Sequence, residues 1–183
     1  MLEKTSIRKK MKSLRKMNYV FNPDASYNAC KIFLQNNQLK KNALVGVYWP
    51  INFELDTRPL IKYLSEKKIC LALPFINKQR MIFKKWKISD KLAATKYSFY
   101  APLDSSTTVK PSIILVPCLA YDQHGNRVGY GKGFYDKYYY SNKKSNYIGF
   151  AYKFQAVEIL PTNKYDLKLN SIVSECNFYK IEN

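Results

Sequence analysis

The clearest guide to the fold is the stretch 113–136, which reads IILVPCLAYDQHGNRVGYGKGFYD. It opens with a short apolar run, residues 113–116, that predicts a buried β-strand. A turn-rich segment follows over residues 122–133, and a helix is expected to begin at Phe134. Because α/β proteins bind ligands beyond the carboxyl ends of their strands, this order of strand, loop and helix predicts a binding site in the loop.

The loop concentrates glycine, since three of the six glycines in the protein alternate with other residues over positions 129–133. Glycine lets the backbone approach a ligand closely, and a helix N-terminus attracts phosphate. Lys132 adds a positive charge, Arg127 a forked donor, and Asp136 an oxygen ligand suited to Mg²⁺. The spacing matches neither the P-loop nor the dinucleotide fingerprint. The residues alone therefore indicate an anion-binding loop, with a plain tight turn as the alternative.

Outward from this stretch, apolar runs alternate with helical patterns. Strands are expected at residues 43–49, 69–73, 81–86 (at a sheet edge), 113–116 and 147–151. Helices are expected at about residues 3–17, from Asn22-Pro23-Asp24 to Asn36, after Thr57-Arg58-Pro59, and from Phe134. Residues 89–106 are expected to be loop with helical pieces. The order predicts an α/β sandwich around a mainly parallel sheet, built as one domain over residues 1–183.

The N-terminal helix is basic and amphipathic. Its three apolar positions are spaced i, i+4 and i+7, and they are Ile7, Met11 and Leu14. A mitochondrial presequence would have this character. A helix that docks its apolar face on the domain and offers Lys4 and Arg8 to a ligand would have it equally, and we favour this interpretation.

Composition restricts the class of protein. With 46% hydrophobic residues among 183, the chain can bury a proper core, and it has neither a membrane-length apolar run nor a signal-peptide core. We therefore expect a protein that stays in the cytoplasm. The four cysteines form no C-x-x-C pair and are expected to be buried, reduced thiols. The single histidine, His124, is interpreted as a turn residue and argues against a histidine metal cluster or a Ser/His/Asp triad.

The net charge of +18 raises a second class of function. Thirty-one Lys and Arg against 13 Asp and Glu would suit a nucleic-acid-binding module. The basic residues are mostly scattered lysines in a chain also rich in Asn, Tyr and Ile, so a solvated surface with no dedicated nucleic acid is the favoured interpretation.

The stretch quoted above closely resembles the signature of the 5-formyltetrahydrofolate cyclo-ligases, also called 5,10-methenyltetrahydrofolate synthetases. The resemblance extends along the chain through Lys4 and Arg8, Tyr48-Trp49-Pro50, Glu54-Leu55-Asp56-Thr57, Gly149-Phe150-Ala151-Tyr152, Gln155, Leu160-Pro161 and Asp166. It implies a three-layer α/β/α sandwich. It also implies ATP- and Mg²⁺-dependent conversion of 5-formyltetrahydrofolate, with or without a polyglutamate tail, to 5,10-methenyltetrahydrofolate, with release of ADP and phosphate by a monomer.

The resemblance also implies a role for each site residue. ATP would contact Lys4, Arg8, Arg127, Gly129, Tyr130, Gly131, Lys132, Gly133, Phe134 and Tyr135. The folate would contact Trp49, Glu54, Tyr130, Gly131, Lys132, Gly133 and Phe134. Lys132 and Tyr135 would act in catalysis, and Mg²⁺ would bind Asp136 and Asp166. Position 130 is Tyr where some members carry Arg, and Trp49 stands where smaller apolar residues also occur.

Glu54 also has a physical reason to bind a pterin, because a pterin presents adjacent N–H and NH₂ donors that one carboxylate accepts as a pair. Without the resemblance, two plainer interpretations stay open: Glu54 is an exposed acid in a loop, and Trp49 is an aromatic residue of the core. A third class of function, an ATP-dependent kinase or ligase for another small acid, would share the loop but lack this pterin site.

Overall fold

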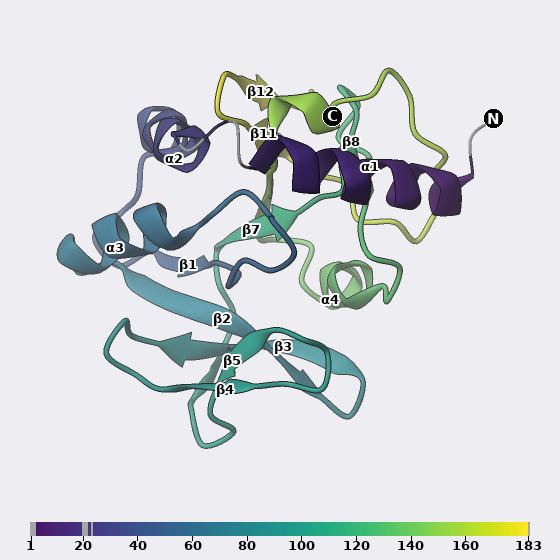
Figure 1. The fold of residues 1–183 in the computed structure, drawn as a ribbon. Helices are drawn as coiled ribbons and strands as arrows, with labels where there is room; N and C mark the ends of the chain where they lie inside the picture. Colours follow the sequence, from purple (N-terminus) through teal and green to yellow (C-terminus); the bar gives the residue numbers. More distant parts are fainter. Residues whose placement is uncertain (1–2, 20–21, 23, 183) are drawn as a thin grey trace.

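The computed structural model describes residues 3–19, 22 and 24–182 (Figure 1). Over these ranges the helices are α1 (Lys4–Tyr19), α2 (Ala25–Asn36), α3 (Arg58–Glu66) and α4 (Phe134–Ser141), with a 3₁₀ turn at Lys153–Gln155. The larger strands are β1 (Leu44–Gly46), β2 (Cys70–Asn77), β3 (Arg80–Trp86), β7 (Ile113–Pro117), β10 (Asn146–Phe150), β11 (Ser171–Val173) and β12 (Phe178–Lys180). Short strands complete the described part as β4 (Leu92–Ala94), β5 (Tyr100–Pro102), β6 (Thr108–Val109), β8 (Ala120–Tyr121) and β9 (Arg127–Val128).

The described strands form one eight-stranded sheet in the order β12-β11-β10-β7-β1-β2-β3-β6. The five central strands, from β11 to β2, are parallel, and antiparallel strands flank them at both ends. From β1 the chain continues to β2 on one side, whereas β7 lies on the other side and leads to β10. The strand order thus reverses between β1 and β7, which is where an open α/β sheet forms its ligand crevice.

The two faces of the sheet carry separate cores. On one face, strand residues such as Val45 and Leu71 pack against α2 and α3, with Phe33 and Leu64 fully buried. On the other face, Phe83 lies 5.1 Å from the ring of Tyr138 in α4. Helices therefore cover both faces, and the predicted three-layer α/β/α sandwich is confirmed (Figure 1).

Helix α1 packs on the domain, as the docked-helix interpretation expects. Its Ile7 and Met11 are buried against Leu119, Val128 and Leu160 in a third apolar cluster. This contact lays the basic helix beside β8 and β9 and directs its polar face toward the loop that follows β9.

Several sequence-based expectations need correction. Residues 89–106 contain the β4–β5 hairpin and not helical pieces, because two three-residue strands are too short to show an alternating pattern. The strand at 81–86 is interior, since β3 pairs with both β2 and β6. Two cysteines, Cys70 and Cys176, are exposed.

The starts of α2 and α3 were predicted correctly, but the residues expected to begin them behave differently in the structure. Helix α2 begins directly after Asp24, and Pro23 lies outside the described residues. Helix α3 begins after Thr57, but the Thr57 hydroxyl donates to the Tyr48 carbonyl at 2.6 Å and does not cap the helix. Among the described helices, none has the length and apolar character needed to cross a bilayer.

Candidate active site

A cavity of about 1160 Å³ opens beyond the carboxyl ends of β1 and β7. Its wall comes from residues 48–54 after β1, from residues 127–137 after β7, from α1, and from the β4–β5 hairpin. Every residue to which the sequence assigned a role lines this one cavity; they are Lys4, Arg8, Trp49, Glu54, Arg127, Gly129, Tyr130, Gly131, Lys132, Gly133, Phe134, Tyr135, Asp136 and Asp166. Residues up to 162 positions apart in the chain therefore meet at the predicted end of the sheet.

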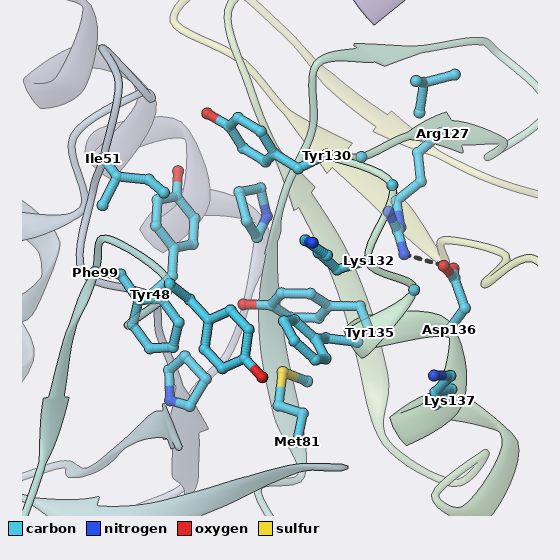
Figure 2. Close-up of a pocket in the computed structure, with 18 of the residues that line it drawn as sticks. Tyr48, Ile51, Met81, Phe99, Arg127, Tyr130, Lys132, Tyr135, Asp136 and Lys137 are labelled. Carbon is cyan, nitrogen blue, oxygen red and sulfur yellow. Dashed lines mark hydrogen bonds and ion pairs between the residues drawn. The ribbon is translucent and has the colours of Figure 1, made fainter. Parts of the chain in front are cut away.

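The cavity has two chemically different sides. Figure 2 shows Tyr48, Ile51 and Phe99 on one side and the Arg127–Asp136 ion pair on the other. Lys132 and Tyr135 lie between these sides (Figure 2). One side thus suits a flat apolar ring, and the other suits a charged group.

The glycine loop needs its glycines for conformation and for space. Gly131 and Gly133 have φ angles of 98° and 67°, in the region that side chains disfavour. A Cβ on Gly131 would lie 3.3 Å from Cζ of Arg8. Arg8 is held there because its Nε donates to the Gly129 carbonyl at 2.9 Å. The loop backbone and α1 therefore form one surface around the exposed Lys132.

Two carboxylates on the charged side are held in place by cations. Asp136 accepts from Arg127 at 2.6 Å and from the Leu167 amide at 3.0 Å through the same oxygen, Oδ1. Asp166 accepts from Lys4 at 2.5 Å and from the Asn163 amide at 2.8 Å through Oδ2. The hydrogen bond from the Leu167 amide to Asp136 therefore holds the neighbouring residue Asp166 on the same side of the cavity as Asp136.

These carboxylates fit a magnesium site of the nucleotide type. No described hydrogen bond engages Asp136 Oδ2 or Asp166 Oδ1, so each group retains one oxygen for an ion. Within the described ranges no three His, Cys, Asp or Glu side chains gather as a protein-only metal cage. Mg²⁺ commonly uses one or two carboxylates and completes its shell with phosphate oxygens and water.

Glu54 lines the cavity beside Ile51 and is buried, with only 4% of its surface exposed. Its Oε2 accepts from the Ile51 amide at 3.0 Å. Burial raises the pKa of Glu54 to about 7, although the Arg15 charge and hydrogen bonds from Ile51 and Tyr130 lower it. Glu54 is therefore a core carboxylate facing a cavity and not the exposed loop acid that the sequence left open.

Trp49 and Tyr135 also line the cavity. The ring of Trp49 is half-buried and packs edge-on against Trp86 at 6.0 Å. The Tyr135 hydroxyl is buried and has no hydrogen-bond partner among the described residues, and burial raises its pKa. The Arg127 guanidinium lies 5.9 Å from the Tyr135 ring. A ligand oxygen in the cavity would give this hydroxyl the partner that it lacks.

Comparison with known proteins agrees with this geometry. Residues 1–175 match the 5-formyltetrahydrofolate cyclo-ligase family. The chain belongs to this family. It is 29% identical over 140 residues to the 5-formyltetrahydrofolate cyclo-ligase of Escherichia coli, a match that covers 71% of this chain and 76% of that protein.

Solved structures of family members are also similar. The 5,10-methenyltetrahydrofolate synthetase of Aquifex aeolicus has a TM-score of 0.83 and 25% identity, covering 100% of this chain and 94% of that one. The 5,10-methenyltetrahydrofolate synthetase of Mycoplasma pneumoniae has a TM-score of 0.76 and 19% identity, covering 95% of this chain and 99% of that one. At that lower identity the likeness concerns the fold alone.

Some residues in or behind the cavity wall were not predicted from the sequence. Tyr97 and Phe99 come from the hairpin that was expected to be loop and helix, and the Tyr97 ring packs on Phe134 at 5.2 Å. Lys12 lies 5.4 Å from the Tyr130 ring centroid. Arg15, buried behind Tyr130, donates to the Tyr130 hydroxyl. Helical spacing is the signal that could have found them, because Lys12 lies four residues after Arg8 and Arg15 lies four residues after Met11 on the apolar face.

Proposed function

We propose that this protein closes 5-formyltetrahydrofolate to 5,10-methenyltetrahydrofolate with consumption of ATP. One observation carries the proposal: a single cavity joins a buried carboxylate on an aromatic side to a glycine and lysine loop on a charged side. The aromatic side suits a pterin, whose paired N–H and NH₂ donors match Glu54. The charged side suits a triphosphate.

In the proposed reaction the formyl oxygen attacks the γ-phosphate and ADP leaves. N10 of the folate then attacks the formyl carbon, phosphate departs, and the N10 proton is lost as the ring closes. Such chemistry depends on positioning and charge neutralisation and needs no nucleophilic side chain. Lys132 and Arg127 would stabilise the charge that develops on the phosphate oxygens. Lys132 lies between the two sides of the cavity, where the reacting atoms would meet.

The remaining residues would bind and orient the two substrates. Lys4 and Arg8 from α1, with the amides of the glycine loop, would hold the triphosphate. Asp136 and Asp166 would hold Mg²⁺, which when bound neutralises phosphate charge. Trp49 and the hairpin aromatics would enclose the folate ring.

The substrate and setting complete the proposal. The folate would bind with or without a polyglutamate tail, and the protein would act as a monomer in the cytoplasm. The net charge of +18 would steer anionic substrates toward the cavity and would serve no dedicated nucleic acid.

A change in the glycine loop tests the nucleotide part of the proposal. Gly131→Ala should weaken ATP binding about tenfold, because a side chain at this φ strains the backbone and crowds Arg8. Calorimetric titration of ATP into both proteins measures the effect. Unfolding curves provide the control, and equal ATP affinity in a normally folded variant would contradict the role of the loop.

The choice of acid substrate tests the folate part. Release of ADP should depend on 5-formyltetrahydrofolate, and small carboxylic acids that lack a pterin should not replace it. If such an acid supported ADP release as well as the folate does, the kinase or ligase alternative would be correct.

A further inference from the structure

Arg15 is a fully buried cation that none of the roles above uses. Its side chain is only 1% exposed, and it lies on α1 behind the wall of the cavity. Its Nη2 donates to the Tyr130 hydroxyl, and its Cζ lies 5.5 Å from the centroid of the Tyr130 ring. Nε and Nη1 have no hydrogen-bond partner, and no carboxylate forms an ion pair with Arg15, within the described part of the chain.

A buried guanidinium stays charged, and a buried charge without a counter-charge is costly. The nearby acid is Glu54, which is also buried and also lacks a direct ion pair in the described ranges. Tyr130 contacts Arg15 and lies close to Glu54, since its hydroxyl accepts from Arg15 and helps to lower the pKa of the Glu54 carboxyl. A hydroxyl that accepts on one side has its proton free to donate on the other.

We propose that Arg15 is a positioning residue for folate recognition, and that it acts through the Tyr130 hydroxyl to keep Glu54 a hydrogen-bond acceptor that faces the cavity. The inference rests on the proposed function, because it assumes that Glu54 accepts from the pterin. Accepting from two donors at once requires the ionised carboxylate, since a protonated one presents a donor to the ligand.

Among the groups around Glu54, Arg15 has the largest effect in favour of the ionised carboxylate. Burial raises the pKa of Glu54 to about 7, and the Arg15 charge is the largest effect that lowers it. The other titratable groups around Glu54 stay uncharged at neutral pH because burial raises their pKa values; they are Tyr48, Cys118, Tyr130 and Tyr135. Loss of Arg15 therefore removes the charge that most favours the Glu54 carboxylate.

The direction of the pH effect follows. Folate affinity of the wild-type protein should rise as pH increases through the pKa of Glu54, near 7, because only the ionised form accepts the pair. In Arg15→Met this rise should move to higher pH by about one to two units, which is the size of effect a neighbouring charge has. At pH 7 the folate affinity should then fall about five- to fiftyfold, and the difference should narrow to about twofold or less at pH 9.

Titrations of 5-formyltetrahydrofolate without ATP, from pH 6 to pH 9, measure these profiles in the full-length protein. Arg15→Lys keeps a cation and should lie closer to wild type than Arg15→Met does. Lys16→Met removes an exposed charge from the same helix and should match wild type. Glu54→Gln cannot ionise and should lose the rise at pH 7. A separate ATP titration should be nearly unchanged in Arg15→Met, because Lys4 and Arg8 on α1 stay docked.

Tyr130→Phe provides a second variant that removes only the hydroxyl between Arg15 and Glu54. Its rise in folate affinity should also move to higher pH. An Arg15→Met profile with the wild-type midpoint would overturn the inference, as would a loss of affinity equal at every pH, which indicates a structural role. If wild type binds the folate normally in those cases, the proposed function stands. If wild type binds no folate at any pH, the proposed function and the inference both fail.

Discussion

Lys132→Met should reduce turnover about a hundredfold while the protein folds normally, because a preorganised charge that faces a developing negative charge contributes about this much to the rate. Lys132 is the exposed cation of the glycine loop and lies between the two sides of the cavity (Figure 2). Its removal should lower kcat more than it raises KM for either substrate, since it acts mainly in the transition state.

Steady-state kinetics of wild type and Lys132→Met provide the measurement. Lys144→Met is a matched control, because Lys144 is also exposed but does not line the cavity, and its kinetics should equal those of wild type. Near-normal turnover in folded Lys132→Met would contradict the proposal that this loop binds the phosphates of ATP.

Glu54→Gln should weaken 5-formyltetrahydrofolate binding about ten- to a hundredfold at pH 8, where the wild-type carboxylate is ionised. Glutamine keeps the size of the side chain but replaces one acceptor with a donor, which would face a pterin N–H or NH₂. ATP affinity should barely change, because Glu54 lies on the aromatic side of the cavity.

Paired titrations of folate and ATP on both proteins check this expectation. Parallel weakening of both ligands would show that buried Glu54 supports the fold instead. Unchanged affinity for both would show that the pterin binds elsewhere.

The sequence predicted best where the residue pattern has a single physical meaning. The continuous apolar runs of β1, β2, β7 and β10 are buried on both faces of a parallel sheet, and each was placed within a few residues. The loop over residues 129–133 was also placed correctly, directly before the helix that begins at Phe134. The order of these elements was sufficient to predict the sandwich.

The parts that were missed depend on contacts between distant segments. The β4–β5 hairpin is held by two three-residue strands and by packing of Tyr97 on Phe134, which no local pattern reveals. Likewise β11 and β12 are short, and the pairing of β11 with β10 and of β12 with β11 depends on the tertiary fold. Tyr97 and Phe99 therefore entered the cavity wall unpredicted.

Within the site, sequence and structure contributed differently. The resemblance brought Asp166 together with Lys4, whereas spacing alone could not have paired residues at opposite ends of the chain. The burial of Glu54 and Arg15 was not predicted, because both residue types are usually exposed. Arg15 lies four residues after Met11 and shares its buried helix face, which the basic character of the segment obscured.

The most direct test of the central claim is to follow product and cofactor together. Purified protein with ATP, Mg²⁺ and 5-formyltetrahydrofolate should produce the methenyl chromophore with one ADP released per product formed. Omission of ATP or Mg²⁺ should abolish both signals. Release of ADP without the methenyl product, or no reaction of the folate in a protein that binds ATP, would contradict the account.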